Sequence, residues 1–487
     1  MSNRPETNKQ SCPVYKKCGG CQLQNLSYPE QLEFKQKKVE KLLKRFCTVE
    51  KIIGMKTPYH YRNKVQAAFY TDKKGKIISG VYQSGSHHVV GIDSCQTEDV
   101  IADKIIVAVR KLLPSFRMTT YNEDTGKGFL RHILVKRGFA TNQIMLVLVT
   151  GTPVFPSKNN FVKAILKQFP EITTIVQNIN PYRTNLVLGD NQKVLYGKGY
   201  IEDILCGCRF RISPKSFYQI NPIQTEVLYG KAIEFANLKG NETVLDTYCG
   251  IGTIGIIAAK NGAGNVIGAE LNGDAVRDAI VNARANNLKN IRFYKADAGE
   301  FMREAADEDE KPDVVFMDPP RAGSDRKFLD SLIKMSPKKV VYVSCNPETL
   351  ARDLAYLTQN SPYKAQKIQP VDMFPHTAHI ETVVLLSHKK PDGHINVKVE
   401  FGEGEGKVPL DNIAKRAESY KPKERVTYKM IKEYIEAKYG FKVHTAYIAE
   451  VKRDLGLPMY DAPNAVEELK QPRKHPTAEK VEAIKDA

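Results

Sequence analysis

Several features that the sequence lacks exclude whole classes of protein. No apolar run reaches the roughly 20 residues that a membrane-spanning helix needs, so a membrane protein is excluded. Residues 1–11 are polar and show no export signal, which predicts a cytoplasmic protein. Tryptophan is absent, which says nothing about function. Nine cysteines, an odd number, favour reduced thiols over a disulfide framework.

Acidic residues are scarce in the first half of the chain. Residues 1–238 hold 35 Lys and Arg against 18 Asp and Glu, a net charge of +17, whereas residues 239–390 are neutral and residues 391–487 carry +1. A local excess of this size is what binding to a phosphate backbone requires, so we expect an RNA partner. A basic surface without a partner is the alternative. No basic amphipathic helix with an aromatic face stands out, and we expect no membrane partner.

The patterning divides the chain into three regions. Residues 12–238 mix helical patterns (28–46 and 101–113) with strand patterns and hairpins, which predicts an α+β region. In residues 239–390 strands alternate with helices, which predicts a doubly wound parallel sheet of the Rossmann type with strands at 243–246, 265–270, 291–295, 313–317, 340–345 and 381–386. Residues 391–487 form a small C-terminal extension of unknown role, with helical stretches at about 425–438 and 446–455.

Reactive side chains end two of the expected strands. Cys345 follows the strand 340–345, and Asp318 follows 313–317 in the run Asp318-Pro-Pro-Arg321. Open α/β sheets place their chemistry at the carboxyl ends of parallel strands, which predicts an enzyme with a covalent step. The alternative is that Cys345 is one more buried cysteine.

A glycine-rich loop follows the strand 243–246. Asp246, Gly250 and Gly252 belong to the run Asp-Thr-Tyr-Cys-Gly-Ile-Gly, which opens a helix and lets a ligand approach the backbone. Glu270 ends the next strand, where an acid binds ribose hydroxyls, and Asp297 ends the third, where it can accept from an adenine amino group. These acids suit any adenosine ligand, so a dinucleotide stays open, as do ordinary strand-end caps.

The N-terminal cysteines are closely spaced. Cys12, Cys18 and Cys21 lie within ten residues, and Cys95 is the best candidate for a fourth ligand. Zinc and an iron–sulfur cluster both fit such a set. His376 and His379 do not make a helical metal face, and we expect them to order a loop or to contact RNA.

Residues 12 to about 388 resemble the S-adenosylmethionine-dependent RNA 5-methyluridine methyltransferases, especially the iron–sulfur members that modify 23S rRNA. The resemblance rests on these motifs, in this order: Cys12-x5-Cys18-Gly-Gly-Cys21, Tyr61-Arg-Asn-Lys64, Ser216-Phe-Tyr-Gln219-Ile-Asn-Pro222, Asp246-x2-Cys-Gly-x-Gly252, Asp318-Pro-Pro-Arg321, Ser344-Cys345-Asn-Pro347 and His376-Thr-Ala-His-Ile-Glu381. It implies Cys345 as nucleophile, Glu381 as general base, a [4Fe–4S] cluster on Cys12, Cys18, Cys21 and Cys95, and methyl-donor contacts from Gln219, Tyr248, Glu270 and Asp318.

We therefore expect a monomeric RNA uracil-5-methyltransferase that uses S-adenosyl-L-methionine, with 23S rRNA favoured over tRNA. A thiolate at Cys345 would add to carbon 6 of uracil, so its pKa should lie below the usual value of about 8.5. The alternatives are a NAD- or flavin-dependent iron–sulfur oxidoreductase and a non-catalytic RNA-binding scaffold.

Overall fold

The computed structural model describes residues 12–388 except 84, 87, 185 and 309, and within the C-terminal part it describes 428–441, 443, 447–448, 451 and 477–486. The chain divides into two compact units, residues 1–394 and 395–487. No helix in the described ranges combines the length and the apolar character that crossing a bilayer requires.

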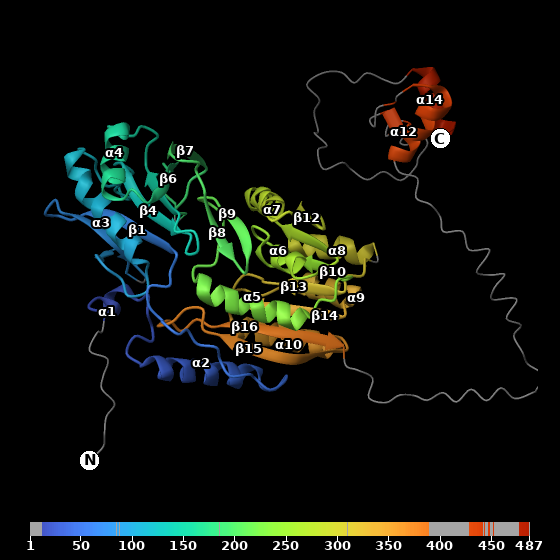
Figure 1. Ribbon diagram of the computed structural model, residues 1–487, viewed down its shortest axis with the longest axis horizontal. Helices are drawn as coiled ribbons and strands as arrows, with labels where there is room; N and C mark the ends of the chain where they lie inside the picture. Colours follow the sequence, from blue (N-terminus) through green and yellow to red (C-terminus); the bar gives the residue numbers. More distant parts are fainter. Residues whose placement is uncertain are drawn as a thin grey trace, which may run out of the picture. The chain divides into compact units, whose positions relative to one another are not determined.

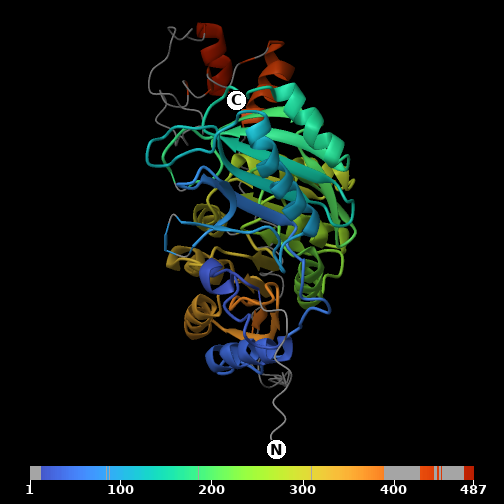
Figure 2. The same cartoon turned by 90° about the vertical axis from the view of Figure 1, so that its left-hand side faces the viewer.

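The first sheet is built from residues 64–196 and has the order β3-β2-β1-β4-β5-β6-β7. All neighbours are antiparallel except β5 and β6, which α4 connects. Helices α3 and α4 pack on one face (Figures 1 and 2). The elements up to this sheet's end are α1 (Tyr15–Cys18), α2 (Tyr28–Leu43), β1 (Lys64–Thr71), β2 (Ile77–Tyr82), β3 (Val89–Gly91), α3 (Val100–Ser115), β4 (Leu130–Arg137), β5 (Ile144–Thr150), α4 (Lys158–Gln168), β6 (Ile172–Ile179) and β7 (Asn191–Tyr196).

A two-stranded hairpin, β8 (Ile201–Leu205) and β9 (Cys208–Ile212), follows the first sheet. Its turn residues Cys206 and Gly207 both have positive φ, at 49° and 72°, as the tightest hairpin turns require. Phe210 and Ile212 belong to one hydrophobic core with Leu134 of the first sheet and Val244 of the second. The hairpin therefore links the two sheets. Its turn lies at Cys206-Gly207, so the prediction of a hairpin turn at residues 197–199 and of a continuous strand through residues 206–208 is wrong.

The second sheet has the order β12-β11-β10-β13-β14-β16-β15. Five strands are parallel, whereas β16 runs antiparallel to both β14 and β15, so the prediction of a wholly parallel sheet is wrong at its last strand. The elements are α5 (Pro222–Ala236), β10 (Thr243–Asp246), α6 (Thr253–Lys260), β11 (Asn265–Glu270), α7 (Gly273–Ala285), β12 (Ile291–Lys295), α8 (Ala298–Asp307), β13 (Val314–Met317), α9 (Arg326–Met335), β14 (Lys339–Ser344), α10 (Pro347–Asn360), β15 (Tyr363–Val371) and β16 (Glu381–His388).

N-terminal residues complete the second sheet's core. Helix α2 packs beside α10 and β15, which Figure 1 shows in blue against orange. After it, Val49 and Ile53 form parallel bridges with Ile368 and Val371 of β15. The predicted domain boundary at residue 238 stays a prediction. Both α2 and α5, which precede it, nevertheless pack against the second sheet.

The second unit contains α12 (Tyr428–Tyr439) and α14 (Ala478–Asp486). A small cluster of buried apolar residues joins them, namely Ile435, Val443, Ile448, Val451 and Ile484. The helix predicted at 425–438 is confirmed from Tyr428 onward, while most of the stretch predicted at 446–455 lies outside the described residues.

Candidate active site

Cys345 and Glu381 lie at the end of one antiparallel strand pair. Ser344 of β14 pairs with Thr382 of β16, so the next residues in register are Cys345 and Glu381. Cα atoms opposite each other in such pairs are about 4.5–5.5 Å apart. Asp318 follows β13, the neighbouring strand on the other side of β14. Three predicted site residues therefore meet at one sheet edge.

Burial sets the protonation of this group. It raises the pKa of Asp318 to about 7, and burial followed by repulsion from Asp318 raises the pKa of Glu381 well above its ordinary value. Burial, then Glu381 and Asp318, raises the pKa of Cys345 to about 11, while Arg321 acts in the opposite direction. The expected lowered pKa of Cys345 is thus wrong, because burial of the thiol, followed by the Glu381 and Asp318 carboxyls, outweighs the effect of Arg321.

The Asp-Pro-Pro-Arg turn is fastened to the Ser-Cys-Asn-Pro turn. The Asn346 side-chain amide and the Thr349 hydroxyl both donate to the Arg321 carbonyl, each at 3.2 Å. The Arg321 guanidinium lies 3.2 Å from Nδ1 of His379. These contacts hold Arg321 beside Cys345, the position from which its charge acts on the thiol.

The glycine-rich loop between β10 and α6 is built for a ligand. One carboxylate oxygen of Asp246 accepts from the Gly255 N–H at 2.8 Å, and its other oxygen is buried without a hydrogen-bond partner. Burial, together with Asp318 and Glu270, raises the pKa of Asp246 to about 7. The hydrogen bond from Gly255 acts in the opposite direction and lowers it. Gly250 has φ +55° and open space where a side chain would lie. A ligand can therefore approach the backbone here.

A pocket of about 460 Å³ lies beside this loop. Gly250 and Glu270 line it together with Ser216 and Phe217 of the predicted cofactor motif. The Glu270 carboxylate accepts from the Gly250 N–H at 3.1 Å and from the Asn272 N–H at 2.7 Å. The structure thus brings two distant sequence motifs to one pocket.

Gln219 is held from the first sheet. Asn63 donates from its side chain to the Gln219 carbonyl at 3.1 Å and from its backbone to Ile220 at 2.9 Å. The Gln219 side chain hydrogen-bonds the hydroxyl of buried Tyr229, whose pKa burial and the Asp318 charge raise. Tyr229, which sequence reasoning missed, therefore places Gln219 near the acidic group.

Tyr248 and Asp297 have partners of their own and do not line the 460 Å³ pocket. The Tyr248 hydroxyl lies 3.4 Å from that of Ser324, and its ring packs on Phe328. Asp297 is exposed and caps α8 by accepting from the Gly299 and Glu300 N–H groups at 2.9 and 3.1 Å. Asp297 therefore does what an ordinary strand-end cap does.

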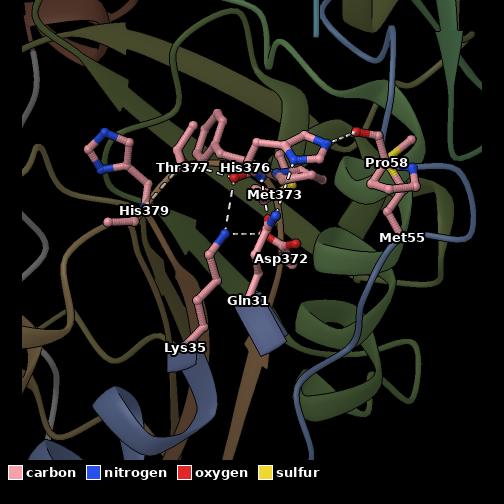
Figure 3. A network of polar contacts seen from close by, with 12 residues as sticks. Gln31, Lys35, Met55, Pro58, Asp372, Met373, His376, Thr377 and His379 are labelled. Atoms are coloured by element: carbon pink, nitrogen blue, oxygen red, sulfur yellow. Dashed lines mark hydrogen bonds and ion pairs between the residues drawn. The ribbon is translucent and has the colours of Figure 1, made fainter. Parts of the chain in front are cut away.

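The loop that leads into Glu381 is anchored by α2 (Figure 3). Lys35 and Asp372 form an ion pair in which both side chains are fully buried. Gln31 accepts from the His376 N–H at 2.9 Å, and the His376 ring lies 2.9 Å from the Pro58 carbonyl. His376 thus orders the loop as predicted. The His379 side chain points away from His376 and its partners in Figure 3.

The four predicted cluster cysteines lie near one another. Burial, then repulsion from Cys95, Cys18 and Cys12, raises the pKa of Cys21 to about 12. Nevertheless, within the described ranges no group of three or more His, Cys, Asp or Glu side chains is arranged to hold a metal ion. The thiols are gathered, but a coordination geometry is not shown.

Comparisons with known proteins agree with this arrangement. Residues 183–389 match the family of tRNA (uracil-5-)-methyltransferases. An uncharacterized RNA methyltransferase of Bacillus cereus is 44% identical over 388 residues, covering 79% of this chain and 84% of the relative, and one of Listeria monocytogenes is 47% identical over 379 residues, covering 77% and 83%.

Among solved structures, the chain resembles the Pyrococcus abyssi tRNA (uracil-54, C5)-methyltransferase in complex with S-adenosyl-L-homocysteine. The TM-score is 0.64 at 30% identity, covering 78% of this chain and 87% of that one. These two relatives and this structure each match between 77% and 79% of the chain. The chain therefore belongs to the RNA (uracil-5-)-methyltransferase family.

Proposed function

We propose that this enzyme methylates carbon 5 of a uridine in RNA, with S-adenosyl-L-methionine as methyl donor. One observation carries the proposal: Cys345, Glu381 and Asp318 lie together at one edge of the second sheet. The loop that begins at Asp246 leaves the sheet at the same edge. Family membership argues against the oxidoreductase and scaffold alternatives.

The residues around the glycine-rich loop fit the donor. Asp246 offers a buried oxygen without a partner, Gly250 leaves open space, and Glu270 lines the 460 Å³ pocket. We assign Gln219, Tyr248, Asp318 and Gly252, which lie outside the 460 Å³ pocket, to a binding site that continues from it. Asp297 would join them through the carboxylate oxygen that does not cap α8. When bound, the donor supplies an electrophilic methyl group, and a similar solved relative holds S-adenosyl-L-homocysteine.

The protein's residues supply the remaining steps. The Cys345 thiol loses its proton to solvent, and the thiolate sulfur bonds to carbon 6 of the uracil. The 5,6 double bond opens to an enolate, which makes carbon 5 nucleophilic. After carbon 5 has taken up the methyl group, Glu381 removes the proton from carbon 5. Elimination restores the ring double bond and breaks the bond to sulfur, which frees Cys345. Because burial and then Asp318 raise the pKa of Glu381, this carboxyl has to be in its deprotonated form before it can take the proton from carbon 5.

We favour 23S rRNA as substrate because the cysteine motif resembles that of the ribosomal members. A tRNA substrate is the second candidate, favoured by the likeness to the Pyrococcus abyssi tRNA enzyme. The +17 charge of residues 1–238 supports an RNA partner of either kind. We place the enzyme in the cytoplasm. We also propose that it is a monomer, which gel filtration tests.

Methyl transfer to unmodified transcripts tests the function. Wild-type protein, S-adenosylmethionine and transcripts of 23S rRNA or tRNA should yield 5-methyluridine at a defined position by mass spectrometry. Cys345→Ala should abolish the product and retain donor binding by calorimetry. Cys47→Ala is the matched control, because burial raises the pKa of that thiol to about 11 as well. Near-wild-type product from Cys345→Ala would exclude covalent catalysis.

We further propose a [4Fe–4S] cluster on Cys12, Cys18, Cys21 and Cys95, which the gathering of the four thiols supports. Anaerobically purified protein should be brown, and Cys18→Ser should lose that absorbance. Colourless wild-type protein containing zinc would show that the site holds another metal.

A further inference from the structure

A second pocket, of about 340 Å³, lies on the first sheet and has no part in the site described above. It is formed where β1 and β2 end and β4 begins. Aromatic rings and several charged or titratable side chains line it, notably Phe69, Tyr70, Tyr82, Tyr121, Arg131 and His132. Its volume is at the small end of the roughly 300–1,000 Å³ of ligand sites.

Three residues that line this pocket each have a buried side-chain atom without a hydrogen-bond partner, namely Nδ1 of His132, the Tyr121 hydroxyl and Nε of Arg131. These residues are only 3–4% exposed. Buried polar groups are almost always paired, so such atoms call for a ligand. Burial, with the neighbouring Arg131, lowers the pKa of His132 to about 4, so its ring is neutral and Nδ1 can donate or accept depending on the tautomer.

The walls of the pocket are fixed in place. A β-bulge between Leu130 and His132 directs Arg131 and His132, neighbours on β4, to the same pocket. Arg131 donates to the Asn180 and Tyr182 carbonyls at 2.8 and 2.6 Å and lies 4.3 Å from the centre of the Tyr121 ring. The Arg131 guanidinium and the Tyr121 ring are therefore held against each other, while the more exposed rings of Tyr70 and Tyr82 are accessible to a ligand.

The chemistry of the lining selects a neutral planar ligand. Arg131 and Arg183 balance Glu123 and Asp124 among the lining residues, so a phosphate group gains no net attraction here. Aromatic side chains and arginine planes are the surfaces on which unstacked RNA bases bind. We propose that this pocket binds one nucleobase of the substrate RNA, splayed out of its stack near the target uridine. This inference rests on the proposed function.

The pocket faces the same way as the loop of the proposed active site. His132, Leu134 and Lys136 alternate onto one face of β4, and Leu134 belongs to the core shared with the second sheet. The Lys136 ammonium donates to the Ser213 and Ser216 carbonyls, both at 2.8 Å, in the loop before Gln219. The four-residue step along β4 from His132 to Lys136 spans about 13 Å, so a few nucleotides of single-stranded RNA can reach from the pocket to the loop before Gln219.

A base-deletion scan tests the pocket. The probe is the shortest 23S rRNA or tRNA transcript fragment that the wild type methylates, with an abasic nucleotide placed singly at each position near the target. Affinities are measured in the Cys345→Ala background, alone and combined with Tyr70→Ala, Arg183→Ala or Tyr196→Ala. Tyr70 is 38% exposed and lines the pocket, whereas Tyr196, 42% exposed on β7, does not.

One abasic position other than the target should weaken binding by about 5- to 100-fold. That loss should persist with Tyr196→Ala and fall below twofold with Tyr70→Ala or Arg183→Ala, because those variants no longer hold the base. Equal losses in all variants at every position would overturn the pocket assignment while methylation of the transcript stands. A protein that methylates no transcript overturns the proposed function instead, and S-adenosylmethionine binding shows whether each variant is folded.

Discussion

At the scale of single residues, the protonation of Glu381 governs the last chemical step that we propose. Its pKa is raised well above the ordinary value, first by burial and then by Asp318. Below that pKa the carboxyl carries a proton and cannot accept one from carbon 5. Deprotonation becomes more complete as the pH rises through this pKa, so the fraction of active base increases.

We therefore expect release of the methylated RNA from a preformed adduct to accelerate with pH, about tenfold per pH unit below the pKa of Glu381. Glu381→Gln should make release slow and independent of pH, and a gel shift should show the trapped adduct. Starting from the adduct removes the Cys345 titration from the measurement. Glu348→Gln, an exposed acid at the start of α10, is the control. Wild-type release from Glu381→Gln would remove it as the base.

The buried ion pair between Lys35 and Asp372 should dominate the stability of the loop before Glu381. Lys35→Met leaves the Asp372 carboxylate buried without its cation and should lower the free energy of unfolding by about 3–5 kcal/mol in urea titrations. Lys37→Met is the control, since its exposed pair with Glu33 should contribute about 0–1 kcal/mol.

The double variant Lys35→Met with Asp372→Leu separates charge from packing. It removes both charges, so it should regain most of the lost stability. If Lys35→Met alone costs no more than Lys37→Met, the ion pair does not anchor the loop.

The sequence predicted which residues would lie close together, but not how this proximity changes their pKa values and burial. Cys345, Asp318 and Glu381 each end or begin a strand, so sheet topology alone brings them together. The pKa of Cys345 depends instead on the burial and charge of neighbours from other strands, which a local motif does not contain. Lys35 is one of several lysines in α2, and its burial depends on a partner 337 residues away.

At the scale of elements, the turn from β10 into α6 depends on Gly252. Its φ is +81°, and an added Cβ would lie 2.7 Å from the Phe293 ring. Gly252→Ala should therefore destabilise the fold by more than about 1 kcal/mol and weaken S-adenosylmethionine binding, measured by denaturation and calorimetry.

Gly230→Ala is the matched control for Gly252→Ala. Gly230 lies inside α5 with nothing within 4 Å of an added Cβ, so alanine should stabilise the helix by up to about 1 kcal/mol. Equal effects of the two substitutions would show that the positive φ of Gly252 is not required.

Strong periodicity made most elements predictable. The strands at 243–246, 265–270 and 291–295 were predicted with the bounds that the structure has. β15 was missed because its sequence, Tyr-Lys-Ala-Gln-Lys-Ile-Gln-Pro-Val, interrupts its apolar residues with lysines and contains Pro370. It forms a strand because β16 and the bridges from Val49 and Ile53 enclose it, which are long-range contacts.

At the scale of the whole molecule, the uneven charge should govern affinity for RNA. Each phosphate neutralised by lysine or arginine releases a counterion, so binding weakens steeply with salt. We expect affinity for the methylated transcript to fall at least tenfold between 50 and 200 mM salt, measured by filter binding. S-adenosylmethionine binding in the same buffers is the control, and its affinity should change little with salt. An RNA affinity that changes as little with salt would contradict the role of the +17 region.

The pairing of α2 with β15 also has a consequence for synthesis on the ribosome. Lys35 emerges 337 residues before Asp372, which at about 5–20 residues per second means a wait of roughly 17–70 seconds. During translation the helix has neither its counter-ion nor its strand. The nascent chain can therefore close its catalytic half only when the last strands leave the exit tunnel, and α2 is exposed to chaperones and proteases until then.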